Sequence, residues 1–534
     1  MIHVSAFREI SASDRWGTTR LAPLTLVLLG FLQPAVALAD DVLPQSGSVA
    51  QGNVVITTPR AGNMVLNQSS DRAVVNWGSF SIGQGNSVAI HQPSTSSAIL
   101  NRVTGNTTSQ IHGQLSATGQ VFVVNPNGLF IGEQGTVNAG GGFVGSTLDT
   151  TDSDFMAGQL RFEGLGSSAP VQNAGRVTIG RGGFAALLGG RVTNSGIVTV
   201  PMGRVGFAAG ELVTLDVSGD QFLQVAVPSQ GDTDEMRALI ENSGTVSANG
   251  GQIEMRAATA RDAARNAINL TGVAEARSVT VRGGQIILGG GAGGTVRVSG
   301  KVTTRARTPR RPRIIVTESA RPNARPGGAI AITGRNIALQ GAHIATGGNG
   351  DGGAINIGGA FQGGGTLPSA LYLGVDVETV ITADAGQAGE GGRVILWSDI
   401  RTDFAGQISA RGGTVGGDGG FVEVSGKRTL AFSGEVDTRA PQGATGTLLL
   451  DPHNLTIAED ASSGIADVGD GTIEYAANED DAILSVDLLE RNLLSNNVTV
   501  STPDDGEPTD TQNGNITVAS EINWDSDRHP DIPC

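Results

Sequence analysis

The sequence is poor in several residue types on which most large globular proteins rely. Its 534 residues include a single cysteine, Cys534, and only 4% are aromatic. One cysteine excludes an intramolecular disulfide, so packing and hydrogen bonds must stabilise the fold. Few aromatic residues leave a core of small aliphatic side chains, which suits thin repeated layers better than one large globule.

Positive charge is also scarce. The net charge is −16, and residues 451–534 alone hold 19 acidic and 2 basic residues, so the remainder is close to neutral. This balance excludes nucleic acid as a partner for the chain as a whole. We treat 451–534 as a separate acidic segment. It ends without an element that covers an open sheet edge, so we expect a truncation relative to a longer ancestor.

Patterns that mark catalytic and metal sites are missing. The six histidines are scattered, and neither a zinc motif nor a phosphate-binding loop occurs. In "GGNGDGG", Asp351 falls one residue early for a calcium-binding nonapeptide. A β-helical polysaccharide lyase or hydrolase requires acidic residues that recur in register on adjacent coils. Acidic residues such as Asp216, Glu254 and Asp384 do not recur in this way. We therefore predict a protein that is not an enzyme and has no metal ion and no cofactor.

Glycine, by contrast, is abundant, with 80 residues that separate short β-branched runs such as "NVVITT" and "SVAIHQ". Such runs predict β-strands. Further along, "QNAGRVTIG" and "TNSGIVTV" repeat one pattern and place Asn173 and Asn194 in matching positions. Spacings of about 20 residues and upward indicate one coil per repeat. The expected fold is all-β, a right-handed parallel β-helix with small extra-helical hairpins.

Three segments depart from the repeat. Residues 1–39 have the pattern of a secretory signal peptide, with Ala37 and Ala39 at the cleavage site; a membrane anchor is the alternative. Residues 301–326, rich in arginine and proline, are expected to form a loop extruded from the helix. A solvated insertion is favoured there over a site for anionic glycan or lipopolysaccharide.

The third departure lies near the C-terminus. "DDAILSVDLLERNLLSNN" places Ile483, Val486, Leu489 and Leu493 at helical spacing and predicts one short helix.

One corner is specified by its chemistry. In "VFVVNPNGLFIG", two apolar runs flank Asn125, Pro126, Asn127 and Gly128. Proline fixes its own φ and biases the residue before it toward an extended conformation. Asn127 and Gly128 both tolerate positive φ, which a tight turn needs. The segment predicts a strand, a tight turn and a second strand.

The stretch from Gly52 to Asp149 resembles a known family. It contains "NVVITTP", "VVNWGSFSIGQGNSVAIHQP", "AILNRVTG" and "VFVVNPNG" in that order. This order resembles the N-terminal secretion domain of filamentous-haemagglutinin-type exoproteins of two-partner secretion. We place that domain at residues 40–165 and the β-helical repeats at 166–450.

The resemblance implies export from a Gram-negative bacterium to a secreted or cell-surface location. The partner would be a dedicated outer-membrane transporter whose periplasmic domains recognise the N-terminal domain. Asn101 carries over from the "NRVTG" element, and Asn125, Pro126, Asn127 and Gly128 carry over from "NPNG". The corner would act either as a recognition element for the transporter or as a turn that nucleates folding.

The resemblance also implies a function outside the cell. The leading hypothesis is an adhesin, a haemagglutinin-like rod that binds a host or bacterial surface receptor, with glycans among the candidates. The alternatives are a truncated carrier stalk of a contact-dependent toxin and a haem- or iron-acquisition exoprotein. The last usually shows a cysteine-bearing loop, which the lone Cys534 supports little.

Overall fold

The structure is a computed structural model. It describes residues 42–166, 168–217, 219, 221–230, 237–261, 265–279, 283–306, 327–348, 350–459, 482–502 and 514–523. These residues all belong to one of the two compact units into which the chain divides, residues 39–534. The predicted signal peptide and its cleavage site at Ala37 and Ala39 lie outside the described residues.

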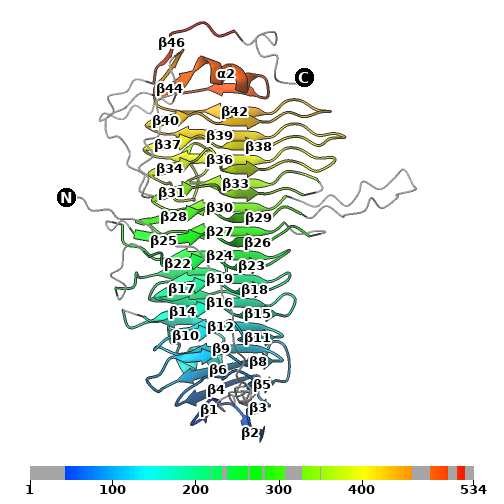
Figure 1. Cartoon of the computed structure of the whole chain (residues 1–534), viewed down its shortest axis with the longest axis vertical. Coiled ribbons are helices and arrows are strands. Elements are labelled where there is room, and N and C mark those ends of the chain that lie inside the picture. The colour runs from blue at the N-terminus through cyan, green and yellow to red at the C-terminus, as the bar shows by residue number, and fades with distance from the viewer. Residues whose placement is uncertain are drawn as a thin grey trace, which may run out of the picture. The chain divides into compact units, whose positions relative to one another are not determined.

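The described chain winds in coils, and Figure 1 shows their strands stacked one above another. The first sheet has 15 strands: β1 (Ser48–Gln51), β4 (Arg72–Trp77), β6 (Ala98–Val103), β9 (Gln120–Val124), β12 (Gly142–Ser146), β16 (Phe184–Gly189), β19 (Arg204–Ala209), β24 (Gln252–Ala257), β27 (Gln285–Gly289), β30 (Ala329–Thr333), β33 (Ala354–Ile357), β36 (Arg393–Ser398), β39 (Phe421–Gly426), β42 (Thr447–Leu450) and β45 (Asn497–Val500).

The second sheet has 14 strands: β2 (Val54–Arg60), β3 (Asn63–Gln68), β5 (Ser87–His91), β8 (Gln114–Ala117), β11 (Thr136–Ala139), β15 (Arg176–Ile179), β18 (Ile197–Thr199), β23 (Thr245–Ser247), β26 (Val273–Glu275), β29 (Lys301–Thr303), β32 (His343–Ala345), β35 (Val380–Thr382), β38 (Gln407–Ser409) and β41 (Glu435–Asp437).

The third sheet has 11 strands: β7 (Ser109–Ile111), β10 (Leu129–Ile131), β14 (Pro170–Asn173), β17 (Arg191–Asn194), β22 (Ile240–Asn242), β25 (Arg265–Leu270), β28 (Gly294–Val298), β31 (Asn336–Leu339), β34 (Tyr372–Val375), β37 (Arg401–Phe404) and β40 (Thr429–Phe432). Along a coil, a strand of the first sheet is followed by one of the third and then one of the second.

Pairing within these sheets is parallel, except that β1 pairs with β4 and β2 with β3 in antiparallel fashion. The predicted parallel β-helix is therefore confirmed.

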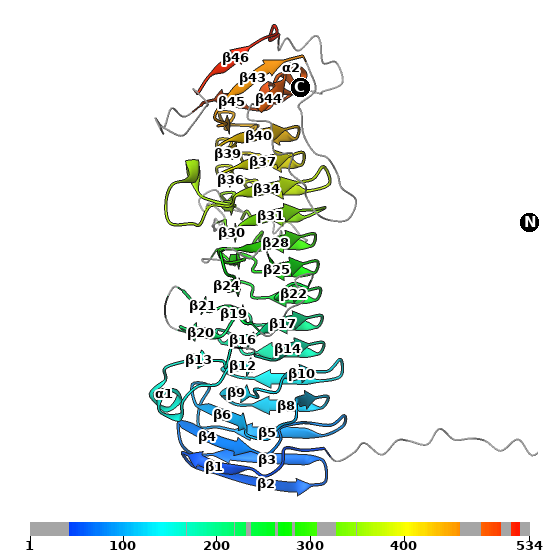
Figure 2. The same ribbon diagram turned by 90° about the vertical axis from the view of Figure 1, so that its left-hand side faces the viewer.

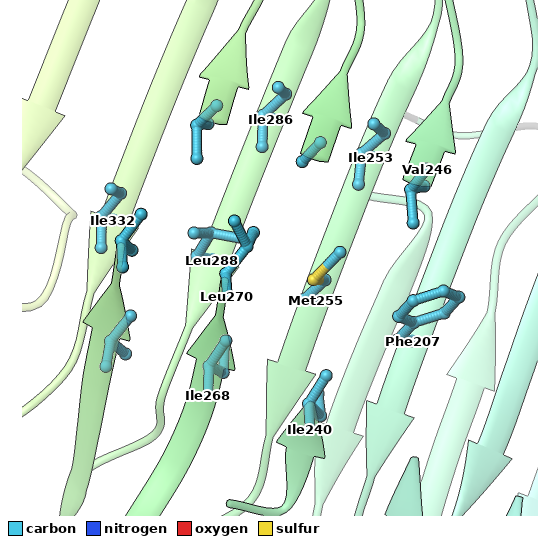
Figure 3. Close-up of a cluster of buried hydrophobic side chains, with 14 of the residues drawn as sticks. Phe207, Ile240, Val246, Ile253, Met255, Ile268, Leu270, Ile286, Leu288 and Ile332 are labelled. Atoms are coloured by element: carbon cyan, nitrogen blue, oxygen red, sulfur yellow. The ribbon is translucent and has the colours of Figure 1, made fainter. Parts of the chain in front are cut away.

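The interior of the coils is filled by columns of apolar side chains in register, most of them aliphatic. Phe207, Met255, Leu288 and Ile332 are successive Cα partners on neighbouring strands of the first sheet. Figure 3 shows this column within the core. All four are at most 1% exposed, and burial of one such side chain stabilises the fold by about 1.5–3 kcal/mol. The repeat thus supplies a continuous core without large aromatic clusters.

A second apolar cluster lies on the outer face of the first sheet. It joins Phe122 and Phe184, which point outward from the sheet, to Phe155, Phe162 and Phe222. The last three belong to segments that leave the coils. These segments form the helix α1 and a small antiparallel sheet of β13, β20 and β21. Their bounds are Asp152–Ala157, Arg161–Glu163, Leu212–Leu215 and Leu223–Ala226.

Figure 2 shows these elements outside the stack on one side. The predicted extra-helical hairpins are confirmed. The helix α1 was not predicted, because six residues are too few to display a helical period.

Two predictions near the irregular segments need correction. Residues Lys301–Thr303 do not belong to an extruded loop, because they form β29 and pair with β26 and β32. Residues 307–326 of that predicted insertion lie outside the described residues. The short C-terminal helix is confirmed as α2 (Val486–Leu493), but Ile483 lies in a strand.

The remaining elements are short. A 3-10 turn, η1, spans Phe361–Gly363. A last parallel sheet contains β43 (Leu455–Ala458), β44 (Ala482–Ser485) and β46 (Ile516–Val518). None of the described helices is long and apolar enough to cross a membrane.

Candidate functional site: the stacked NPNG and NRVTG corners

The NPNG corner links β9 of the first sheet to β10 of the third. The Gly128 N–H donates to the Asn125 carbonyl at 3.0 Å, which closes a four-residue turn. Inside it, the Asn127 N–H donates to Asn125 Oδ1, also at 3.0 Å. This second bond mimics a backbone turn with a side chain, as asparagine often does. The predicted tight corner is therefore present, with Asn125 as the acceptor for both bonds.

Only one residue of the corner has positive φ. Gly128 has φ +115°, and a Cβ placed there would lie 3.3 Å from Thr108 Cγ2. The φ of Asn127 is not positive. Proline at the second position and glycine at the fourth favour a type I turn, in which the third residue keeps negative φ. Asn127 is thus used for its side chain and not for its backbone tolerance.

The Asn side chains tie this corner to the corner of the preceding coil. Asn125 Nδ2 donates to the Thr107 carbonyl and to Ser109 Oγ, each at 2.9 Å. Asn127 Nδ2 donates to the Gly105 carbonyl at 2.8 Å. Gly105 ends the NRVTG element, and Thr107 and Ser109 lie two and four residues after it. The two family elements, far apart in the sequence, are therefore in direct contact.

Asn101 lies in β6 with its side chain inside the coil. Its Oδ1 accepts from Trp77 Nε1 at 3.1 Å, and its Nδ2 donates to the Phe122 carbonyl at 3.3 Å. Its Cα partners on the neighbouring strands are Val75 and Val123, which belong to the core. The amide oxygen and the amide nitrogen of Asn101 thus each have a hydrogen-bond partner, as a buried polar side chain requires.

Sequence reasoning missed Arg102, which follows Asn101 directly. Its Nε donates to Asp149 Oδ1 at 2.9 Å, and its other nitrogens bond Asp152 Oδ1 and the Thr150 carbonyl. Burial alone lowers the pKa of this guanidinium, but the hydrogen bonds of Asp152 and Asp149 outweigh it, so the pKa of Arg102 is raised. The alternation within "NRVTG" is the signal: Asn101 points inward, so Arg102 must point outward, toward the α1 segment.

Exposure divides the five predicted residues into two groups. Asn101, Asn125 and Gly128 are buried, whereas Pro126 and Asn127 are exposed. In the folded coil, a partner can touch only the second group. The remaining positions hold the corner together.

The acidic residues considered for catalysis are not brought together. Glu254 is fully buried and ion-paired with Arg256 at 2.8 Å. Asp384, several coils away, is ion-paired with Arg411 at 2.9 Å. Across the part of the chain that the structure describes, no group of three or more His, Cys, Asp or Glu side chains is placed to hold a metal ion.

Comparison with known proteins identifies the family. The model of the TPS secretion domain matches residues 40–304. The crystal structure of the HMW1 secretion domain from Haemophilus influenzae is similar to this chain. It is 29% identical, covers 75% of this chain and 99% of its own, and superposes with a TM-score of 0.62. The chain is a two-partner secretion exoprotein.

Curated relatives of this exoprotein are similar over a shorter part. A heme/hemopexin-binding protein of Haemophilus influenzae strain Rd is 29% identical over 276 residues, which are 50% of this chain and 30% of the relative. A second Haemophilus influenzae protein of the same name is 35% identical over 122 residues, 23% of this chain and 13% of the relative. The matched part thus spans less than a third of either relative.

Proposed function

We propose that this exoprotein leaves the cell through an outer-membrane transporter whose periplasmic domains recognise the stretch that matches the secretion domain. The observation behind the proposal is that residues 40–304 match the secretion-domain family and contain the NPNG and NRVTG corners in one hydrogen-bonded stack. Export would begin with a signal peptide cleaved after Ala39. The product would be secreted, with cell-surface association as a further option.

Within this proposal, the stacked corners act mainly as a folding element. Asn125 makes its bonds to Thr107 and Ser109 only when two successive coils have wound onto each other. Folding of the exported chain on the outer side would keep it from returning through the transporter. Pro126 and Asn127, which are exposed, remain available for direct recognition.

The test is an export assay in a Gram-negative host with and without the cognate transporter. Three variants separate the two roles: Asn125→Ala breaks the buried network, Pro126→Ala changes the exposed surface, and Asn138→Ala changes an exposed residue of β11. We expect transporter-dependent export that Asn125→Ala reduces and the other two retain. Loss with Pro126→Ala in a chain that still folds would assign the corner to recognition. Export without the transporter would overturn the proposal.

Outside the cell, we propose that the exoprotein acts as an adhesin-like binding rod. The regular stack of coils offers long, nearly repetitive outer surfaces, as solenoid binding proteins do. Binding of the purified chain to host cells and to bacterial cells, read by flow cytometry, tests this role. Absence of binding to both would contradict it.

A second candidate is haem or hemopexin binding, because two curated relatives are named heme/hemopexin-binding protein. Titration of the purified chain with haem, followed by its absorption spectrum, and with immobilised hemopexin tests this candidate. A saturable shift or specific capture would favour it over the adhesin. A carrier stalk for a toxin remains the third alternative from the sequence.

A further inference from the structure

A cavity of about 760 Å³ opens between two segments that leave the coils. One wall includes Val225 of β21, and the opposite wall includes Pro368 and Leu371, which follow η1. The floor is formed by the ends of β24, β27 and β30 and the turns after them. Its volume lies in the range of pockets that hold small organic ligands, which is roughly 300–1,000 Å³.

Three arginines line this cavity, against one acidic residue. They are Arg256, Arg261 and Arg335, and the acid is Asp399. We call it the arginine cavity. Outside the acidic segment 451–534 the chain is close to neutral, so three arginines against one acidic residue make this hollow locally positive. Positive charge gathered in a hollow attracts anions and raises their local concentration.

Neither Arg261 nor Arg335 forms an ion pair with a carboxylate in the described part of the chain, although Asp399 lines the same cavity. Arg335 Nη1 donates to the Arg261 carbonyl at 3.1 Å, which holds the two residues together without cancelling either charge. Arg256 is different, because its Nε is ion-paired with the buried Glu254 at 2.8 Å. That pair fixes the direction of the Arg256 side chain.

A second cavity, of about 430 Å³, makes the contrast clear. It is also lined by arginines, but Arg411 is ion-paired with Asp384 at 2.9 Å and Arg439 with Asp437 at 2.8 Å. Those guanidinium groups already have their carboxylates. Of these two cavities, the arginine cavity has more arginines without an ion-paired carboxylate among the described residues: Arg261 and Arg335, against Arg491 alone in the second cavity.

Gly289 at the end of β27 keeps the floor of the arginine cavity open. A Cβ placed on Gly289 would have no heavy atom nearer than 3.6 Å, and the nearest atoms are Arg256 Cγ and Nη1. Its φ is not positive, so the backbone does not require glycine here. Glycine within a strand often marks the close approach of a ligand. The missing side chain leaves space directly beneath the Arg256 guanidinium.

We propose that the arginine cavity binds an acidic saccharide of about disaccharide size that has carboxylate or sulfate groups. The guanidinium fork matches both groups with paired hydrogen bonds. The apolar walls at Val225, Pro368 and Leu371 suit the C–H faces of sugar rings. None of the described residues that line the cavity is a His, Cys, Met or Tyr, which are the usual axial ligands of haem iron.

The test is calorimetric titration of the purified full chain with a sulfated heparin disaccharide, a digalacturonate, citrate and neutral lactose. We expect an acidic disaccharide to bind, with an affinity that falls as salt rises, and lactose not to bind. Arg261→Gln with Arg335→Gln should weaken the affinity by at least about tenfold. Gly289→Val should block binding by filling the floor.

The matched control is Arg176→Gln, at an exposed arginine of β15 far from the cavity in the sequence and on a different sheet. It should leave the affinity unchanged, and circular dichroism should show that Gly289→Val still folds. Failure of both acidic disaccharides to bind overturns the proposal, as does equal weakening by Arg176→Gln. Citrate binding as tightly as the disaccharides would overturn the saccharide assignment. The readout needs no transporter, so it succeeds or fails independently of the export proposal.

Discussion

Asn125 illustrates how much one side chain contributes to this fold. It accepts two bonds from Asn127 and donates two more, to the Thr107 carbonyl and Ser109 Oγ. Its side chain and Ser109 are both fully buried, so water cannot replace the Asn125 amide as the partner of Ser109 Oγ. At the residue scale, the chain is stabilised by a few such asparagines at corners, placed among columns of aliphatic side chains.

We predict that Asn125→Ala lowers the free energy of unfolding by about 1–3 kcal/mol, because the buried Ser109 hydroxyl loses its partner, and one such loss costs about that much. Denaturant unfolding followed by circular dichroism measures the change, with Asn138→Ala as the exposed control. A loss below about 0.5 kcal/mol would mean that water or a shifted backbone replaces the network.

Glu423 is a buried carboxyl group whose pKa makes the stability of the fold depend on pH. It lies on the outer face of β39 beneath η1, where the Gln362 N–H donates to its Oε1 at 3.0 Å. Burial, with the nearby charge of Asp451, raises the pKa of Glu423 from its ordinary value of 4.5 to about 7. Between about pH 4.5 and about pH 7, the folded protein therefore keeps a proton on Glu423 that the unfolded chain releases.

This shift predicts a specific pH dependence. The stabilising contribution of protonated Glu423 is fully present below about pH 4.5 and is lost as pH rises toward about 7, which amounts to about 2–3 kcal/mol. Glu423→Gln should remove that slope and be more stable than wild type at pH 8. Asp384 and Glu211 have lowered pKa values and act in the opposite direction, so the variant must be compared with wild type at each pH. Glu435→Gln, at an exposed position, should leave the slope in place.

At the scale of elements, three successive strands of the third sheet share a ladder of asparagines. Asn173 Nδ2 donates to Asn194 Oδ1, and Asn194 Nδ2 donates to Asn242 Oδ1, both at 2.7 Å. The matching positions predicted for Asn173 and Asn194 are confirmed, since they are Cα partners. Ile131 and Leu270 occupy the same register position on the strands that flank the ladder.

We predict that Asn194→Leu costs about 2–4 kcal/mol, because it leaves Asn173 Nδ2 without an acceptor and Asn242 Oδ1 without a donor. Replacing all three by leucine should recover most of that loss, since no unsatisfied amide then remains and the column becomes continuous with Ile131 and Leu270. Denaturant midpoints of the single and triple variants decide the matter. A triple variant less stable than the single one would show that the corner, and not the pairing, needs asparagine.

At the scale of the whole described unit, stability is spread along a stack in which each coil contacts its neighbours. Extra-helical segments cover parts of the first sheet and add a second apolar cluster around Phe122 and Phe184. The unit has no described cluster of metal-ligating side chains, and its sequence allows no intramolecular disulfide. Packing and hydrogen bonds must therefore account for its stability.

It follows that neither metal removal nor reduction should affect the unit. We expect the thermal unfolding midpoint of the purified chain to be the same with EDTA, with calcium and with a reducing agent. Differential scanning calorimetry measures it. A midpoint that rises with calcium would revive the calcium-binding interpretation of "GGNGDGG" around Asp351.

The sequence by itself determined the local features of this protein. Short β-branched runs between glycines predict strands, and Pro126 with Gly128 predicts the corner, because turn chemistry and side-chain alternation act over a few residues. The same local rules found the helix near Val486 but placed Ile483 on the wrong side of its start. The matching positions of Asn173 and Asn194 in successive repeats indicated a longer-range contact, and the two are Cα partners.

Only the tertiary structure decided which distant residues meet. Three features depend on the number of residues in each coil, which decides which side chains become neighbours. They are the contact of Asn127 with Gly105, the ion pairing of Arg102 with the α1 segment, and the raised pKa of Glu423. The arginine cavity depends on two excursions of irregular length that no periodic pattern describes. The physical reason is the same throughout: a coil repeats locally, whereas burial and charge depend on what is stacked above, below and outside it.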